Sequence, residues 1–65
     1  MMLSFGSRSE LILWVIDNYF YGYMYKMTDL ICMNDENLAT EIKEVSKGDL
    51  KMFKKDNEYF LEYLC

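Results

Sequence analysis

The chain contains no histidine and no proline, and its two cysteines, Cys32 and Cys65, lie 33 positions apart. Without histidine or a CxxC spacing, the usual ligands of a zinc ion are missing. The side chain that most often transfers protons in enzymes is missing too, and there is no glycine-rich phosphate-binding loop. The carboxylates stand at expected helix starts and turns, where capping explains them. The sequence therefore predicts a non-enzymatic chain with no catalytic residues, no metal site and no cofactor.

Long hydrophobic runs are also scarce. The longest, residues 11–16, is far too short to cross a membrane, and residues 1–7 contain no basic leader. We therefore expect a cytoplasmic protein with free thiols and no membrane contact. Within it, we expect Cys32 to be a small core residue and Cys65 an exposed residue without a role.

Apolar and aromatic side chains are abundant. Of the 65 residues, 52% are hydrophobic and 17% are aromatic, which is too high a content for a disordered chain. The length fits one domain, residues 1–65, and a domain of this size buries only about 60% of its unfolded surface. We therefore expect marginal stability unless a partner or a second copy contributes.

The first half of the chain predicts a helix over residues 8–21. Ser7 and Glu10 have the spacing of a capping box, and a helical projection gathers most of the large apolar side chains on one broad face. Gly22 suits the end of this helix, because glycine adopts a left-handed conformation at little cost. The alternative is a β-hairpin with strands LILWVI and YFYGYMY joined at residues 17–18, because the residue types of this segment favour strands.

The next segment predicts two short elements. Residues 23–27 alternate with a period of two, which is typical of a strand. A brief helix over residues 30–32 should follow, with Thr28-Asp29 as its cap.

The remainder of the chain predicts a helix and a β-hairpin. Asn34 should cap the helix, and Gly48 should end it. Its apolar stripe consists of Leu38, Ile42 and Val45. Strands at residues 50–55 and 58–64 should then be joined by residues 56–57, an Asp-Asn pair that tolerates the positive φ angles of a two-residue turn.

From Leu30 onward the sequence resembles the winged helix-turn-helix family, which is best known from transcription regulators. The family pattern is two apolar residues, a small residue, an apolar residue, a cap, and apolar positions four, eight and eleven beyond that cap. This chain carries the pattern at Leu30, Ile31, Cys32, Met33, Asn34, Leu38, Ile42 and Val45. The resemblance implies an α+β fold, a small winged-helix-like domain of helix, short strand, short helix, helix and C-terminal β-hairpin. The alternative interpretation of residues 8–21 gives β-hairpin, helix, β-hairpin instead.

DNA binding by this family depends on the third helix, whose first turns enter the major groove. The matching residues here are Asp35, Glu36 and Asn37, and the two carboxylates oppose contact with phosphates. The cations come later, because residues 43–55 carry a net charge of +3 while the rest of the chain carries −7. The lysines of that segment are Lys43, Lys47, Lys51, Lys54 and Lys55. They could form a basic wing through which a transcriptional regulator binds DNA, or a solvated wing that discourages edge pairing.

Binding to another protein is the function that the sequence favours. Trp14 and Tyr21 fall on the otherwise polar face of the first expected helix, and such aromatic residues dominate protein interfaces. The accompanying acidic surface consists of Glu10, Asp17, Asp35 and Glu36. We hypothesise a non-catalytic inhibitor or modulator of phage or viral type, whose acidic surface imitates nucleic acid and meets a basic surface on its partner. Alternatively, Trp14 covers the segment containing Leu3 and Phe5, or the first helix forms a homodimer.

Overall fold

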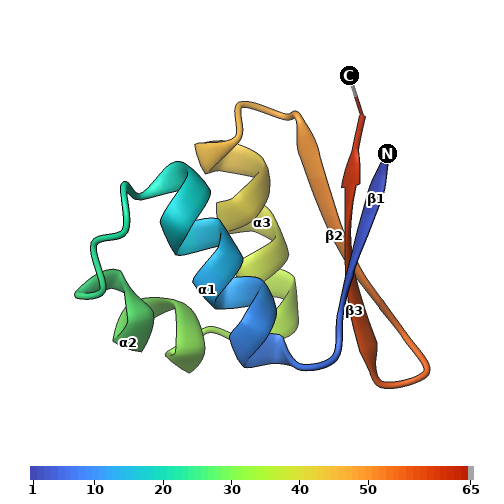
Figure 1. Ribbon diagram of the computed structural model, residues 1–65, viewed down its shortest axis with the longest axis horizontal. Helices are drawn as coiled ribbons and strands as arrows, with labels where there is room; N and C mark the ends of the chain where they lie inside the picture. The colour runs from blue at the N-terminus through green and yellow to red at the C-terminus, as the bar shows by residue number, and fades with distance from the viewer. Residues whose placement is uncertain (65) are drawn as a thin grey trace.

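The computed structural model describes residues 1–64 and shows an α+β domain in which three helices lie on one side of a three-stranded antiparallel sheet, with α1 and α3 against the sheet and α2 against α1 (Figure 1). In chain order the elements are β1 (Met2–Phe5), α1 (Arg8–Tyr19), α2 (Lys26–Cys32), α3 (Asp35–Val45), β2 (Leu50–Lys55) and β3 (Glu58–Tyr63). Strand β3 lies in the centre, between β1 and β2. The predicted α+β class and the predicted C-terminal hairpin are confirmed.

Helix α1 begins where the capping spacing predicted. The Ser7 Oγ accepts a hydrogen bond from the Glu10 backbone N–H at 3.2 Å, and the Glu10 carboxylate accepts one from the Gly6 N–H at 3.3 Å. The helix ends at Tyr19, and both Tyr21 (φ 56°) and Gly22 (φ 74°) then adopt the left-handed conformation. A helix is therefore confirmed over most of residues 8–21, and the alternative hairpin is wrong.

The strand predicted at residues 23–27 is wrong. The Lys26 N–H donates to the Tyr23 carbonyl at 3.2 Å and the Met27 N–H to the Met24 carbonyl at 2.9 Å, so this segment turns and leads into α2. A strand needs a neighbour with which to pair, and the second edge of β3 is occupied by β1. The third strand therefore comes from the start of the chain, and α2 begins four residues earlier than the predicted residues 30–32.

Helix α3 is capped at both ends by the expected segments. The Asn34 Oδ1 accepts from the Asn37 N–H at 2.7 Å. At the other end, the Lys47 N–H donates to the Glu44 carbonyl at 3.1 Å and the Gly48 N–H to the Lys43 carbonyl at 2.8 Å. These two bonds form a Schellman motif, in which the left-handed position next to the helix cap is held by Lys47 (φ 56°) rather than by glycine.

The hairpin turn is formed by Asp56 and Asn57, with φ angles of 53° and 67°. Two consecutive left-handed residues match the twist of the flanking strands, as in a type I′ turn. The register that follows pairs Lys55 with Glu58 and ends with Leu50 opposite Tyr63. The expected turn is therefore confirmed.

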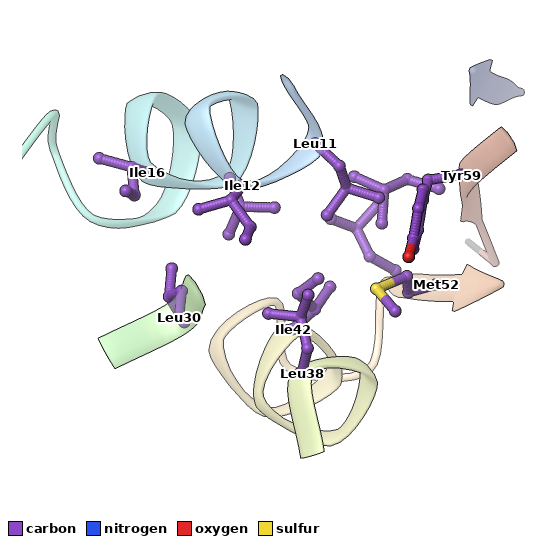
Figure 2. Close-up of a cluster of buried hydrophobic side chains, with 11 residues drawn as sticks. Leu11, Ile12, Ile16, Leu30, Leu38, Ile42, Met52 and Tyr59 are labelled. Carbon is purple, nitrogen blue, oxygen red and sulfur yellow. The ribbon is translucent and has the colours of Figure 1, made fainter. Parts of the chain in front are cut away.

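The core lies between the sheet and the helices, with side chains from all three helices and from β2 and β3 meeting in one cluster (Figure 2). Alternation along the strands directs every second side chain toward this cluster. Its buried members are Leu11, Ile12, Val15, Ile16, Leu30, Leu38, Ile42, Leu50, Met52, Tyr59 and Leu61. No helix formed by residues 1–64 is long and apolar enough to cross a lipid bilayer.

Cys32 is exposed, contrary to the prediction that it belongs to the core. Helix α2 buries only Leu30, and a residue two positions further points about 200° away around a helix. Ile31 is likewise 46% exposed. The prediction for Cys65 concerns a residue outside the described part of the chain.

Candidate functional site

The connection between α1 and α2 exposes more large apolar surface than any other short segment among residues 1–64. Tyr21 is 89% exposed, Tyr23 55%, Met24 53% and Tyr25 70%. We call residues 21–25 the tyrosine loop. The loop lies at the end of the molecule opposite the sheet (Figure 1).

The ring of Tyr23 lies beside those of both Tyr21 and Tyr25. The centroids of Tyr21 and Tyr23 are 6.4 Å apart with the planes at 64°, and those of Tyr23 and Tyr25 are 5.5 Å apart at 33°. Backbone bonds hold the loop that carries them, because the Gly22 N–H donates to the Ile16 carbonyl at 2.9 Å and the Tyr23 N–H to that of Phe20 at 3.0 Å. Rings that are already ordered lose less conformational entropy when a partner covers them.

Polar groups border the loop on both sides. A Cβ atom built on Gly22 would lie 3.9 Å from the Asp17 Oδ1, so this carboxylate lies beside the loop. On the other side, the Lys26 Nζ lies 5.5 Å from the centre of the Phe20 ring. Lys26 and Asp29 also line an open hollow of about 600 Å³ between α2 and the start of α3. An apolar centre with a polar rim is the usual composition of a protein interface.

Of the two predicted aromatic anchors, Tyr21 lies in this loop and Trp14 does not. Trp14 is half-buried against the core, with its ring centre 6.2 Å from that of Phe5 and 6.1 Å from that of Tyr19. These contacts pack β1 onto α1. The geometry therefore favours the alternative interpretation, in which Trp14 covers the N-terminal segment.

The predicted acidic residues Glu10, Asp17, Asp35 and Glu36 have different surroundings on α1 and α3. Glu10 caps α1, and Asp35 connects three elements. The Asp35 Oδ1 accepts from the Arg8 Nε at 3.0 Å, and its Oδ2 accepts from the Tyr59 hydroxyl at 3.4 Å. Asp17 and Glu36 are exposed on α1 and α3.

Arg8 is a structural residue that the sequence interpretation did not single out. Its guanidinium donates to Asp35, to the Ile31 carbonyl at 3.0 Å and to the Met33 carbonyl. It thereby satisfies carbonyls at the end of α2 and joins that helix to α1 and α3. A signal was present, because a cation in the first turn of a helix opposes the helix dipole and suggests a carboxylate partner elsewhere.

The predicted nucleic-acid residues are dispersed over the hairpin and α3. Lys51 lies opposite Glu62 and Lys55 opposite Glu58, while the Lys54 Nζ lies 5.5 Å from the centre of the Tyr59 ring. Lys43 and Lys51 line one hollow of about 430 Å³ together with Thr40, and Lys47 lies at the end of α3.

Counted by structural region, the charges are distributed differently from the count over residues 43–55. Residues 47–65 carry four lysines and four carboxylates, so the hairpin region is neutral overall. Residues 1–46 carry three basic and seven acidic residues, so the whole net charge of −4 belongs to the helical part. Helix α3 alone has four carboxylates and one lysine.

The tyrosine loop was only partly visible in the sequence. Tyr21 was singled out, but Tyr23 and Tyr25 were assigned to a strand because they alternate with other residues. The signal that could have found them is their position after Gly22, in a segment with no predicted strand beside it. Aromatic residues without a pairing partner are left on the surface.

The fold and this surface define a small α+β domain with an exposed aromatic loop on an acidic helical layer. No protein-family model, curated protein or solved structure matches this chain.

Proposed function

We propose that this chain is a non-catalytic protein-binding module that contacts its partner through the tyrosine loop. The observation that carries this proposal is the exposure of Tyr21, Tyr23, Met24 and Tyr25 as one ordered group. Contiguous exposed apolar groups mark interaction sites in soluble proteins, and tyrosine is enriched among the residues that dominate binding energy. The predicted anchor Tyr21 thus gains Tyr23 and Tyr25 as neighbours, in place of Trp14.

The chemistry around the loop favours a partner with a basic surface. The excess negative charge lies in residues 1–46, and Asp17 and Asp29 stand on the two helices that the loop joins. Complementary charge accelerates encounter and orients the partner. By occupying such a surface in the cytoplasm, the chain would act as an inhibitor or modulator, and exposed carboxylates such as Asp17 and Glu36 would imitate nucleic-acid phosphates.

The test is quantitative recovery of partners from the native host with a tagged chain. Replacing Tyr21, Tyr23 and Tyr25 together by serine should reduce the recovered partner by at least about tenfold, because hot-spot tyrosines each contribute about 2 kcal/mol or more. The matched control replaces the same three residues by phenylalanine, which keeps the rings and should retain most of the binding. Equal recovery with the serine and wild-type chains would contradict the proposal.

The role of charge is tested separately by reversing Asp17, Asp29 and Glu36 to lysine. These residues are exposed, so the substitutions should leave the fold intact. The association rate should fall, and its dependence on salt concentration should weaken. Asp35 is a poor choice for this experiment, because its reversal would also break the contact with Arg8.

A second candidate is DNA binding by a winged-helix regulator that uses the hairpin lysines. It is favoured by Thr40 and Lys43, which lie on α3 beside a hollow that β2 also lines. The order α2, α3, β2, β3 agrees with the winged-helix resemblance. The resemblance stays a prediction, because β1 precedes α1, whereas the winged-helix pattern has its short strand after the first helix. The balanced charge of the hairpin region weighs against this candidate, since DNA affinity commonly rests on about 6 to 10 phosphate contacts.

A gel-shift titration of random duplex DNA at low salt separates the two candidates. The DNA-binding candidate predicts a shift at micromolar protein, with a steep salt dependence that flattens when Lys54 and Lys55 are replaced by alanine. No shift under these conditions would exclude it.

A further inference from the structure

The sheet has a second face, which points away from the helices, and no helix formed by residues 1–64 covers it (Figure 1). Strand alternation places every second residue of β2 and β3 there, between the buried positions Leu50, Met52, Tyr59 and Leu61. We call this surface the outer face. Its residues on the two strands are Lys51, Phe53, Lys55, Glu58, Phe60 and Glu62.

The register arranges these six residues in three rows. Lys51 lies opposite Glu62 in the first row, Phe53 opposite Phe60 in the second, and Lys55 opposite Glu58 in the third. The two rings of the middle row are stacked, with centroids 5.2 Å apart and planes at 16°. All the cations are therefore on β2, all the anions are on β3, and an aromatic pair separates the two charged rows.

The lysines and glutamates of the charged rows form no ion pairs with each other among residues 1–64. Among residues 1–64 the one ion pair with an N···O distance within 4.0 Å joins Arg8 to Asp35, on the other side of the molecule's sheet. Neither Lys51 with Glu62 nor Lys55 with Glu58 meets this distance, so these four groups can reach carboxylates and ammonium groups on another molecule.

We propose that the outer face binds a second copy of the same chain. The two-fold axis runs parallel to the strands, lies between the two outer faces, and is aligned with the line midway between β2 and β3. It places β3 of each copy over β2 of the other and keeps every row in register. Glu62 then faces Lys51 of the second copy, Glu58 faces Lys55, and both pairs occur twice. The four phenylalanine rings meet in the middle row, so the surface is complementary to itself, as a two-fold interface requires.

The charge distribution explains why this face, rather than the helical layer, brings two copies together. The helical part carries the whole net charge of −4, so two helical layers repel each other. The outer face has equal numbers of cations and anions, and it presents them in the arrangement that a second copy requires. Two twisted sheets packed in this way lie about 10 Å apart with strands about 30° from parallel, which keeps the middle row in contact.

The size of the face sets the expected affinity. The two strands that overlap in this arrangement, each six residues long, cover roughly 200 Å², since strands lie about 4.8 Å apart and rise about 3.4 Å per residue. A stable interface buries about 800 Å² on each partner, so the dimer should be weak. We therefore expect a weak dimer that forms only at the high end of laboratory concentrations.

Sedimentation equilibrium from about 10 μM to 1 mM, a range set by the weak affinity expected of a small interface, tests the proposal with three charge variants. Replacing Lys51 and Lys55 by glutamate puts anions on both strands, and replacing Glu58 and Glu62 by lysine puts cations on both. Each variant alone should lose dimerisation by at least about tenfold, because like charges then meet. Exchanging all four charges at once restores the complementarity and should restore the dimer.

Two controls make the result specific. A mixture of the all-anion and all-cation variants should form a heterodimer, and adding Phe60→Ser to either should weaken it, which distinguishes this interface from general attraction between opposite charges. The serine variant of the tyrosine loop should dimerise like the wild type, because that loop lies at the other end of the molecule. Circular dichroism and thermal melting of each variant verify that the fold is retained.

The proposal is overturned if the wild type stays monomeric at 1 mM, where a weak small interface should already associate. It is also overturned if a dimer forms but the all-anion variant retains it, or if the four-charge exchange fails to restore it while the protein remains folded. Loss of the dimer in the tyrosine-loop variant alone would assign it to that loop instead.

Discussion

Residues 17–25 and 56–64 have similar sequences, DNYFYGYMY and DNEYFLEYL, but different structures. In the second segment Asp56-Asn57 forms a turn, and the aromatic strand that follows buries Tyr59 and Leu61. In the first, Asp17-Asn18 continues α1, and the tyrosines beyond it are exposed. Similar residue composition therefore gives core in one segment and surface in the other.

The difference between the two segments follows from the strands with which each can pair. Strand β3 pairs with β1 on one side and β2 on the other, so its alternating side chains gain a covered face. The tyrosine loop follows a capped helix, and the strand edge that it could have used is occupied by β1. Burial is thus decided by the availability of a pairing partner, which lies outside the segment itself.

The largest effect on the free energy of unfolding is expected when a buried side chain of β3 is truncated. Leu61→Ala should lower the free energy of unfolding by about 3 kcal/mol, because a fully buried leucine leaves a cavity. The control is Leu13→Ala on α1, where the side chain is 39% exposed and the loss should be about 1 kcal/mol or less. Urea unfolding measures both. Equal losses at the two positions would contradict the assignment of Leu61 to the core.

A smaller effect is expected at Arg8. Its side chain joins α1 to the end of α2 and to the start of α3. Arg8→Ala should cost about 2 kcal/mol, because two backbone carbonyls and Asp35 lose a charged donor. Arg8→Lys should recover part of this, since an ammonium group reaches fewer acceptors at once. Thermal melting of the three chains gives the order, and a neutral Arg8→Ala would show that the network does not stabilise the domain.

Backbone conformation gives a matched pair of predictions. Tyr21 follows the end of α1 and adopts the left-handed conformation (φ 56°), as Lys47 does after the end of α3 (φ 56°). Glycine takes this conformation without the steric cost of a Cβ atom, so Tyr21→Gly and Lys47→Gly should each stabilise the domain by about 0.5 to 1 kcal/mol. Destabilisation at Tyr21 alone would mean that its exposed ring contributes to the fold.

The smallest effect concerns pH. Burial, followed by the proximity of Tyr63 and Asp49, raises the pKa of Tyr19 above 10.0. The folded state therefore retains this proton more strongly, so its contribution is complete below pH 10 and is lost as the pH rises through the raised pKa. Tyr19→Phe should flatten the fall in unfolding free energy measured between about pH 9 and pH 11. An unchanged slope would assign the alkaline loss to other groups.

Much of the fold could be predicted because its signals are local. The cap at Asn34 and the turn at Asp56-Asn57 each depend on neighbouring residues, and both were located correctly. Strand β1 was missed because it is four residues long and pairs with β3 more than fifty positions away. The prediction that Cys32 is buried was wrong, because a short apolar run does not reveal which of its residues an amphipathic helix buries.

The candidate site was predictable only in part, for a related reason. Tyr21 was recognised because it fell on the polar face of a helix. Tyr23 and Tyr25 alternate as they would in a strand, but β1 pairs with the edge of β3 in their place, and both tyrosines are exposed. The lysines were read as one basic segment, whereas the register brings Glu58 and Glu62 opposite two of them.

We propose that the rings of the tyrosine loop serve a partner and are not needed by the fold. Urea unfolding of the chain with Tyr21, Tyr23 and Tyr25 replaced by serine tests it most directly. We expect a free energy of unfolding within about 1 kcal/mol of the wild type, because all three positions are exposed. A loss of more than about 3 kcal/mol, comparable to that of a buried leucine, would contradict it.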